Sequence, residues 1–118
     1  MKDNTIIVQD ISFVNIRKKA EEFASKIADP DTVEGTNIKL LKRHTYTEVS
    51  VHYNSMEICR VKLCCEPCGN PTVYVYGDLI GKTPIAATDN GTITISRRYI
   101  AMVIANLYRD FAKGMYKE

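Results

Sequence analysis

The stretch Thr47–Cys64, TEVSVHYNSMEICRVKLC, decides the fold class of this chain. Apolar and polar side chains alternate on both sides of a short polar break, and such a period of two is typical of β-strands with one buried face. The break, Asn54-Ser55, predicts a tight hairpin turn. The stretch therefore predicts two antiparallel strands. The side chains predicted to share the core face are Val49, Val51, Tyr53, Cys59, Val61, Leu63 and, just after the stretch, Cys65.

Similar patterns continue on both sides of this hairpin. One strand is predicted in residues 37–43 and another in residues 72–76. Two shorter strands, residues 84–87 and 92–96, flank Asn90-Gly91, and Asn-Gly is a strong signal for a hairpin between its neighbours. The strands together predict an antiparallel meander.

A helical period of apolar residues predicts one helix near each end of the chain. The first covers residues 11–28, with Ser12 as its N-cap and Pro30 ending it; the second runs from about Ser96 to Gly114. The predicted fold class is α+β: an antiparallel β-meander of about five or six strands with an N-terminal and a C-terminal helix packed on one face.

The composition is that of an ordinary globular protein. The chain has 118 residues, of which 45% are hydrophobic and 25% charged, and its net charge is +2. We expect one domain, residues 1–118. The first ten residues lack the pattern of a signal peptide and no apolar run could cross a membrane, so we expect a cytoplasmic location, no membrane contact and free thiols.

The segment that holds the cysteines raises the question of zinc. Cys65 and Cys68 have the spacing of one zinc-ribbon knuckle, but a structural site needs four ligands and no second knuckle is present. His44 and His52 would complete a mixed site only if neighbouring strands brought them close. We expect no metal and no cofactor, with Cys59 and Cys65 acting as small buried hydrophobic residues and Cys68 in a turn.

Gly77–Thr83, GDLIGKT, resembles a phosphate-binding loop but lacks its context. Three residues separate the glycines instead of four, and Pro84 follows where the motif requires a helix. We therefore expect no nucleotide hydrolysis there. A pairing of His52 with Cys59 as base and nucleophile remains a distant alternative, and we predict no catalytic residues and a protein that is not an enzyme.

The solvent side of the sheet carries the candidate binding residues. Strand alternation places Ile58, Arg60, Lys62 and Cys64 there. Basic side chains interleaved with tyrosines suit nucleic acid or a nucleotide, because cations meet phosphates and rings stack on bases. The alternative is a protein-interaction or homodimerisation module that uses the same face. The candidate binding residues are Arg43, His52, Arg60, Lys62, Tyr74 and Tyr76, with Arg98 and Arg109 as outer members.

The residues Ile58-Cys59-Arg60, the turn Asn54-Ser55 before them and the closing helix after two shorter strands show a resemblance to a known family. The region from about Thr36 to Met115 resembles the small C-terminal α+β domain of predicted restriction endonucleases. In that family a nuclease domain precedes this domain, and we expect none here; the CCEPCGNP segment also differs from the expected short linker. The resemblance therefore implies an accessory or recognition module without cleavage activity. A phage or defence-system origin is part of the alternative, the protein-interaction module.

Overall fold

The computed structural model describes residues 4–28, 38–43, 45–67, 69–77, 80–88 and 90–116. The expectations for Pro30, His44 and Cys68 concern residues outside this part of the chain. Within it there are two helices and seven strands, in the order β1 (Thr5–Val8), α1 (Ile16–Ile27), β2 (Ile38–Lys42), β3 (Val49–Tyr53), β4 (Met56–Cys64), β5 (Thr72–Gly77), β6 (Gly81–Ala87), β7 (Ile93–Ser96) and α2 (Arg97–Tyr116).

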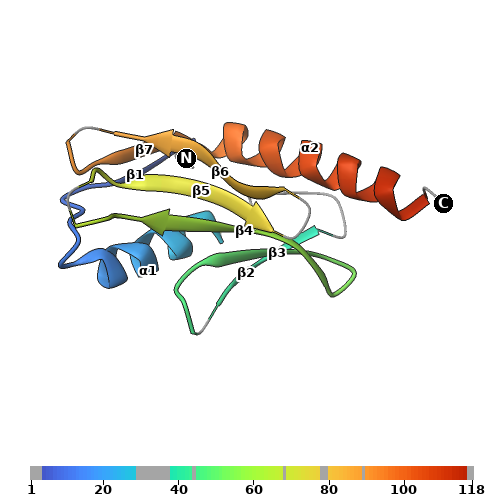
Figure 1. The fold of residues 1–118 in the computed structure, drawn as a ribbon, viewed down its shortest axis with the longest axis horizontal. Helices are drawn as coiled ribbons and strands as arrows, with labels where there is room; N and C mark the ends of the chain where they lie inside the picture. The colour runs from blue at the N-terminus through green and yellow to red at the C-terminus, as the bar shows by residue number, and fades with distance from the viewer. Residues whose placement is uncertain are drawn as a thin grey trace.

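Five strands form an antiparallel sheet in the order β2-β3-β4-β5-β6 (Figure 1), so each strand pairs with its neighbour in the sequence. The β3–β4 turn is the predicted one: Asn54 and Ser55 have φ angles of 49° and 70°. Two successive residues with positive φ are the signature of the turn whose twist fits a two-residue hairpin. The structure confirms the α+β class and the meander.

β7 does not pair with β6, so the hairpin predicted at Asn90-Gly91 is wrong. β7 instead pairs antiparallel with β1 in a separate two-stranded sheet, with Thr5 opposite Ser96 and Val8 opposite Ile93. Gly91 has a φ of +68°, and its carbonyl accepts a hydrogen bond of 2.8 Å from the amide of Ile11. The turn therefore directs the chain from one sheet to the other.

The first helix is shorter than predicted because the residues before it form their own turn. The amide of Ser12 donates to Oδ1 of Asn15 at 2.8 Å, and α1 begins only at Ile16. Ser12 is therefore not the N-cap, and Phe13 is 52% exposed rather than part of the apolar stripe. The buried side chains of α1 are Ala20, Phe23, Ala24 and Ile27.

The closing helix agrees with its prediction. Oγ of Ser96 accepts a hydrogen bond of 3.2 Å from the amide of Tyr99, which caps the start of α2. Ile100 and Ile104 are buried, and the ring of Tyr108 lies 4.7 Å from the ring of Tyr53 on β3.

The core lies on one side of the five-stranded sheet, where both helices and the β1–β7 pair cover it. Figure 1 shows α1 behind β4, and α2 extending from β7 along the upper right of the view. This arrangement leaves the opposite face of the sheet without a covering element in the described residues. The strand residues at the centre of the core are Val49, Val51, Cys59, Val61, Leu63, Val73 and Val75.

Candidate ligand-binding face

The uncovered side of the five-stranded sheet is called the open face below. Its membership follows from strand register, because residues paired across neighbouring strands point to the same side. Arg60 pairs with Tyr76, which pairs with Lys82, and Lys62 pairs with Tyr74. Arg43 and Glu48 lie just outside the paired strands and join this face through contacts with Glu57, Arg60 and Tyr76. The charged and aromatic residues of the open face are Lys39, Arg43, Glu48, His52, Glu57, Arg60, Lys62, Tyr74, Tyr76 and Lys82.

The structure brings most of the sequence-predicted site residues together and leaves two apart. Arg60 and Lys62 on β4 lie beside Tyr76 and Tyr74 on β5. His52 lies on β3, and Arg43 follows the last residue of β2, where its amide donates to the carbonyl oxygen of Glu48 at 2.8 Å. The remaining two, Arg98 and Arg109, are exposed on α2 and do not belong to the sheet.

A bulge in the β3–β4 pairing changes which residues of β4 reach the open face. Val51 pairs with Cys59 but His52 pairs with Glu57, so Ile58 is an extra residue in β4. The alternation therefore shifts, and Ile58 packs against the core instead of facing solvent as the sequence pattern predicted. The same shift brings Glu57 onto the side of Arg60.

Glu57 joins the two arginines of the open face. Its Oε2 accepts a hydrogen bond of 2.9 Å from Nε of Arg60, and its Oε1 accepts one of 3.2 Å from Nη1 of Arg43. The hydrogen bond that Arg60 donates to Glu57 is the main reason that the pKa of Arg60 is raised above its ordinary value. Sequence analysis missed Glu57 because only the bulge turns it to this side.

Glu48 lies beneath these side chains and is almost completely buried, with 1% of its side chain exposed. Its Oε2 accepts a hydrogen bond of 2.5 Å from the hydroxyl of Tyr76. Its Oε1 has no hydrogen-bond partner among the described residues and lies 3.6 Å from Nη1 of both Arg43 and Arg60. Burial of a carboxylate is unfavourable unless opposite charge lies nearby, and Arg43 and Arg60 supply that charge. These two arginines therefore stabilise the folded protein in addition to lying on the open face.

Burial and this contact also change the acidity of Tyr76. Desolvation of the phenol and its hydrogen bond to Glu48 raise the pKa of Tyr76 to about 12. Its hydroxyl therefore keeps its proton, and its role as a donor, at neutral pH. The guanidinium of Arg60 lies 5.8 Å from the centre of the Tyr76 ring. The hydroxyl of Tyr76, like the guanidinium groups of Arg43 and Arg60, already forms contacts within the protein.

The lysines of the open face have fewer internal partners. Lys39 and Lys62 form no salt bridge with other described residues, and Nζ of Lys82 lies 4.2 Å from the centre of the Tyr74 ring. Sequence analysis did not include Lys82 in the site. Lys82 was considered there only as part of a phosphate-binding loop. In the structure Gly77 at the end of β5 pairs with Gly81 at the start of β6, and Lys82 lies in a strand rather than at the start of a helix.

Two hollows lie at the ends of the Tyr74–Tyr76 row. The larger, about 570 Å³, is lined by Arg60, Tyr76 and Lys82 and by Phe111 of α2, among others. The smaller, about 350 Å³, is lined by Tyr74, Lys82 and Cys64, among others. The open face thus offers concave surface next to both tyrosines.

The described cysteines have free thiols and different environments. Cys59 is 1% exposed in the core, and burial raises the pKa of its thiol to about 12. Cys65 packs against the core, with Sγ 3.6 Å from the carbonyl oxygen of Gly69. Cys64 is half-buried. No group of three or more possible metal ligands occurs among the described residues, from which His44 and Cys68 are absent.

His52 and Cys59 do not form a catalytic pair in this structure. His52 lies on the open face, whereas Cys59 lies among the core side chains on the other side of the sheet. A thiol with a raised pKa holds its proton at neutral pH and is a poor nucleophile.

Comparison with protein-family models, with curated proteins and with solved structures finds no match to this chain. No helix in the described part of the chain is long and apolar enough to cross a membrane.

Proposed function

We propose that this protein is a binding module, not an enzyme, whose open face holds single-stranded nucleic acid or a nucleotide. The observation that carries the proposal is the position of Tyr74, half-buried on β5 with Lys62 on one neighbouring strand and Lys82 on the other. A ring with a cation on each side suits a nucleotide, because the base stacks on the ring while the lysines meet phosphates.

The charge of the open face supports an anionic ligand. Five lysines and arginines stand there against two carboxylates, Glu48 and Glu57. Both carboxylates form ion pairs with Arg43 and Arg60. The lysines are therefore the side chains that can bind phosphates. These roles differ from those expected from sequence. In the proposal Arg60 and Tyr76 stabilise the open face through their internal contacts, and Tyr74 and the lysines contact the ligand.

An open antiparallel sheet suits single strands better than a duplex. Stacking on Tyr74 needs a base whose ring face is free, and a duplex hides those faces. The resemblance to the C-terminal domain of predicted restriction endonucleases is a prediction that agrees with a recognition role. The proposal itself rests on the side chains of the open face.

The test is a titration of labelled oligothymidylate with the purified protein, followed by fluorescence anisotropy at several salt concentrations. Binding through phosphates must weaken as salt rises, because bound cations are released from the strand when protein contacts form. Absence of binding at low salt, with folded protein, would overturn the proposal.

A second candidate function is self-association or protein binding through the same face. Leu41 favours it, because this apolar side chain is 47% exposed on β2 opposite Ser50, in the same row as Arg60 and Tyr76. Tyrosine and arginine are also enriched at protein interfaces. Sedimentation distinguishes this candidate: a dimer that becomes a monomer on Tyr74→Arg would support it.

A further inference from the structure

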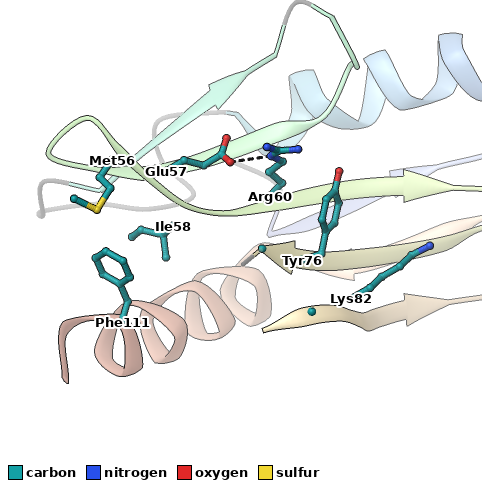
Figure 2. A pocket seen from close by; sticks show the side chains of 9 residues that line it. Met56, Glu57, Ile58, Arg60, Tyr76, Lys82 and Phe111 are labelled. Carbon is teal, nitrogen blue, oxygen red and sulfur yellow. Dashed lines mark hydrogen bonds and ion pairs between the residues drawn. The ribbon is translucent and has the colours of Figure 1, made fainter. Parts of the chain in front are cut away.

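The larger hollow has no cation that is free to bind a phosphate. Figure 2 shows Glu57 bonded to Arg60, and Lys82 pointing away from Phe111. Nζ of Lys82 lies over the ring of Tyr74, and both residues line the smaller hollow. A cation that is already paired with a carboxylate attracts a further anion only weakly. An additional phosphate contact therefore requires a hollow whose cations have no internal partner.

A third hollow lies at the end of the sheet where β4 extends beyond β3. The β3–β4 pairing ends with Val49 opposite Val61, so residues 62–64 of β4 have no partner on β3. α1 borders the hollow on one side, and residues 45–47, between β2 and β3, border it on another. Its volume, about 390 Å³, is within the range of small-molecule sites.

Two cations without internal partners line the third hollow. Arg17, at the start of α1, is exposed, and its guanidinium forms no ion pair with other described residues. Lys62, half-buried on β4, forms none either. The hollow has one carboxylate, Glu21, and its Oε1 lies 3.7 Å from Nζ of Lys42. The third hollow therefore has an excess of positive charge that an anionic ligand can neutralise.

An exposed tyrosine lines the same hollow. Tyr46 is 57% exposed, although its ring is large and apolar. The guanidinium of Arg43 lies 5.8 Å from the centre of this ring, but Arg43 does not line the hollow. Arg43 therefore leaves ring surface available to a ligand within the hollow. Ile16 and Leu63 add apolar surface there, so the hollow suits a base that stacks on the ring.

The backbone beside Tyr46 has an unusual conformation. Thr47 has a φ of 47°, which β-branched residues rarely adopt. Its hydroxyl donates a hydrogen bond of 2.7 Å to the carbonyl oxygen of Tyr46. Strained backbone persists only where the surrounding structure maintains it, and it is common at binding sites. Both features restrict the backbone that carries the Tyr46 ring.

We infer that the third hollow binds one further nucleotide of the strand on the open face, with its base on Tyr46 and its phosphates at Arg17 and Lys62. The inference rests on the proposed function and extends it, because Lys62 pairs with Tyr74 on the open face and also lines the third hollow. A strand with one base on Tyr74 can therefore continue over Lys62 to Tyr46. A nucleotide within a strand has a phosphate on each side of its sugar, which suits a ring that shares its hollow with two cations.

Anisotropy titrations of labelled oligothymidylate at several salt concentrations test the phosphate contact. Arg17→Ala should reduce the slope of log affinity against log salt by about 0.7, the value for one phosphate contact on a single strand. Lys18→Ala is the matched control, because Lys18 is the next residue of α1, is also exposed and does not line the hollow. It should leave the slope unchanged.

The same titrations test the base contact. Tyr46→Ala should weaken oligothymidylate binding roughly five- to 150-fold, which corresponds to about 1–3 kcal/mol for one base–aromatic contact. Tyr46→Phe keeps the ring and should bind like wild type. Tyr99→Ala on α2, 40% exposed, is the control and should not weaken binding. Arg17 and Tyr46 are both exposed, so neither substitution should prevent folding.

The outcomes distinguish the third hollow from the open face. Equal slopes in Arg17→Ala and Lys18→Ala, or equal affinities in Tyr46→Ala and Tyr99→Ala, would overturn the inference. If Tyr74→Ala still weakens binding in that case, the proposed function stands without the third hollow. Wild type that binds no oligothymidylate at low salt would overturn both.

Competition distinguishes a nucleotide of the strand from a free one. Thymidine monophosphate that binds at Tyr46 should displace part of the bound strand if a nucleotide of the strand occupies the third hollow. Binding of thymidine monophosphate that Tyr46→Ala abolishes, but that leaves strand binding unchanged, would assign the third hollow to a free nucleotide and contradict the inference.

Discussion

Tyr76 and Glu48 are 28 residues apart in the sequence, yet the hydroxyl of Tyr76 donates a 2.5 Å hydrogen bond to Oε2 of Glu48. The contact joins β5 to the residue just before β3, across β4. Arg43 and Arg60 supply the positive charge that balances the buried carboxylate. The face proposed to bind a ligand is therefore held in shape by a charged cluster beneath its surface.

Glu48 and Glu57 contact the same two arginines at different depths, which gives a matched comparison. Glu48→Gln should lower the free energy of unfolding by about 3 kcal/mol, the lower end for breaking a buried ion pair, because Arg43 and Arg60 are about a third exposed and regain water. Glu57→Gln, with 32% of its side chain exposed, should cost less than about 1 kcal/mol.

Urea unfolding of the two variants measures this difference. Equal losses of stability, or a larger loss for Glu57→Gln, would show that burial of Glu48 does not govern the cluster.

The raised pKa of Tyr76 predicts a specific alkaline weakness. The phenol loses its proton near pH 10 in the unfolded chain but near pH 12 in the folded one, so rising pH favours the unfolded state between these values. The contribution of Tyr76 to stability is complete below about pH 10 and is lost as pH approaches 12. Tyr76→Phe should be less stable at pH 8 but should lose less stability than wild type from pH 10 to 12.

Thermal melts across this pH range provide the measurement. Parallel loss in wild type and Tyr76→Phe would contradict the assignment of the alkaline transition to Tyr76.

Cys59 should be unreactive in the folded protein. Its thiol is 1% exposed and burial raises its pKa to about 12, so both access and thiolate are lacking at pH 8. Labelling of the native protein with a thiol reagent should be the same for wild type and Cys59→Ala. After unfolding in urea, labelling of the variant should fall short of wild type by that single thiol.

Rapid native labelling that disappears in Cys59→Ala would instead mean that the strand opens readily.

Alternation in the sequence predicted the central sheet well, because each core position of β3, β4 and β5 repeats with period two. It failed at Ile58, where an extra residue in β4 reverses the pattern for Glu57 and Ile58. A bulge depends on the pairing of two strands, and the periodicity of one strand does not contain it.

The second sheet was missed for a related reason. Thr5–Val8 is a short apolar run without clear alternation, and its partner Ile93–Ser96 lies near the other end of the chain. The Asn-Gly signal is local and favoured pairing with the nearer strand. Pairing with β1 buries Ile6 and Val8 together with Ile93 and Ile95, a benefit that only the tertiary structure provides.

The sequence predicted most residues of the candidate site, but not which of them contact a ligand and which form contacts within the protein. Register could be inferred for Arg60, Lys62, Tyr74 and Tyr76 because a hairpin and a meander fix neighbouring strands. The burial of Glu48 could not, since a glutamate before a strand is usually exposed. Lys82 was considered only as part of the rejected phosphate-binding loop. Its position beside Tyr74, which only the structure shows, makes it a member of the candidate site.

The proposed contacts on the open face predict that Tyr74 and Lys62 affect binding in different ways. Tyr74→Ala should cost roughly 1–3 kcal/mol of affinity for oligothymidylate with little change in salt dependence, because stacking involves no charge. Tyr74→Phe keeps the ring and should bind like wild type.

Lys62→Ala should instead reduce the slope of log affinity against log salt by about 0.7, the value for one phosphate contact on a single strand. Lys113→Ala, an exposed lysine on α2, is the control and should leave the slope unchanged. Tyr99→Ala, also on α2 and 40% exposed, is the control for Tyr74→Ala. Anisotropy titrations at several salt concentrations measure both quantities. Equal changes of slope in Lys62→Ala and Lys113→Ala would mean that the strand is held by general charge, and equal losses of affinity in Tyr74→Ala and Tyr99→Ala would mean that Tyr74 does not stack on a base. Either result would show that the assignment of the open face is wrong.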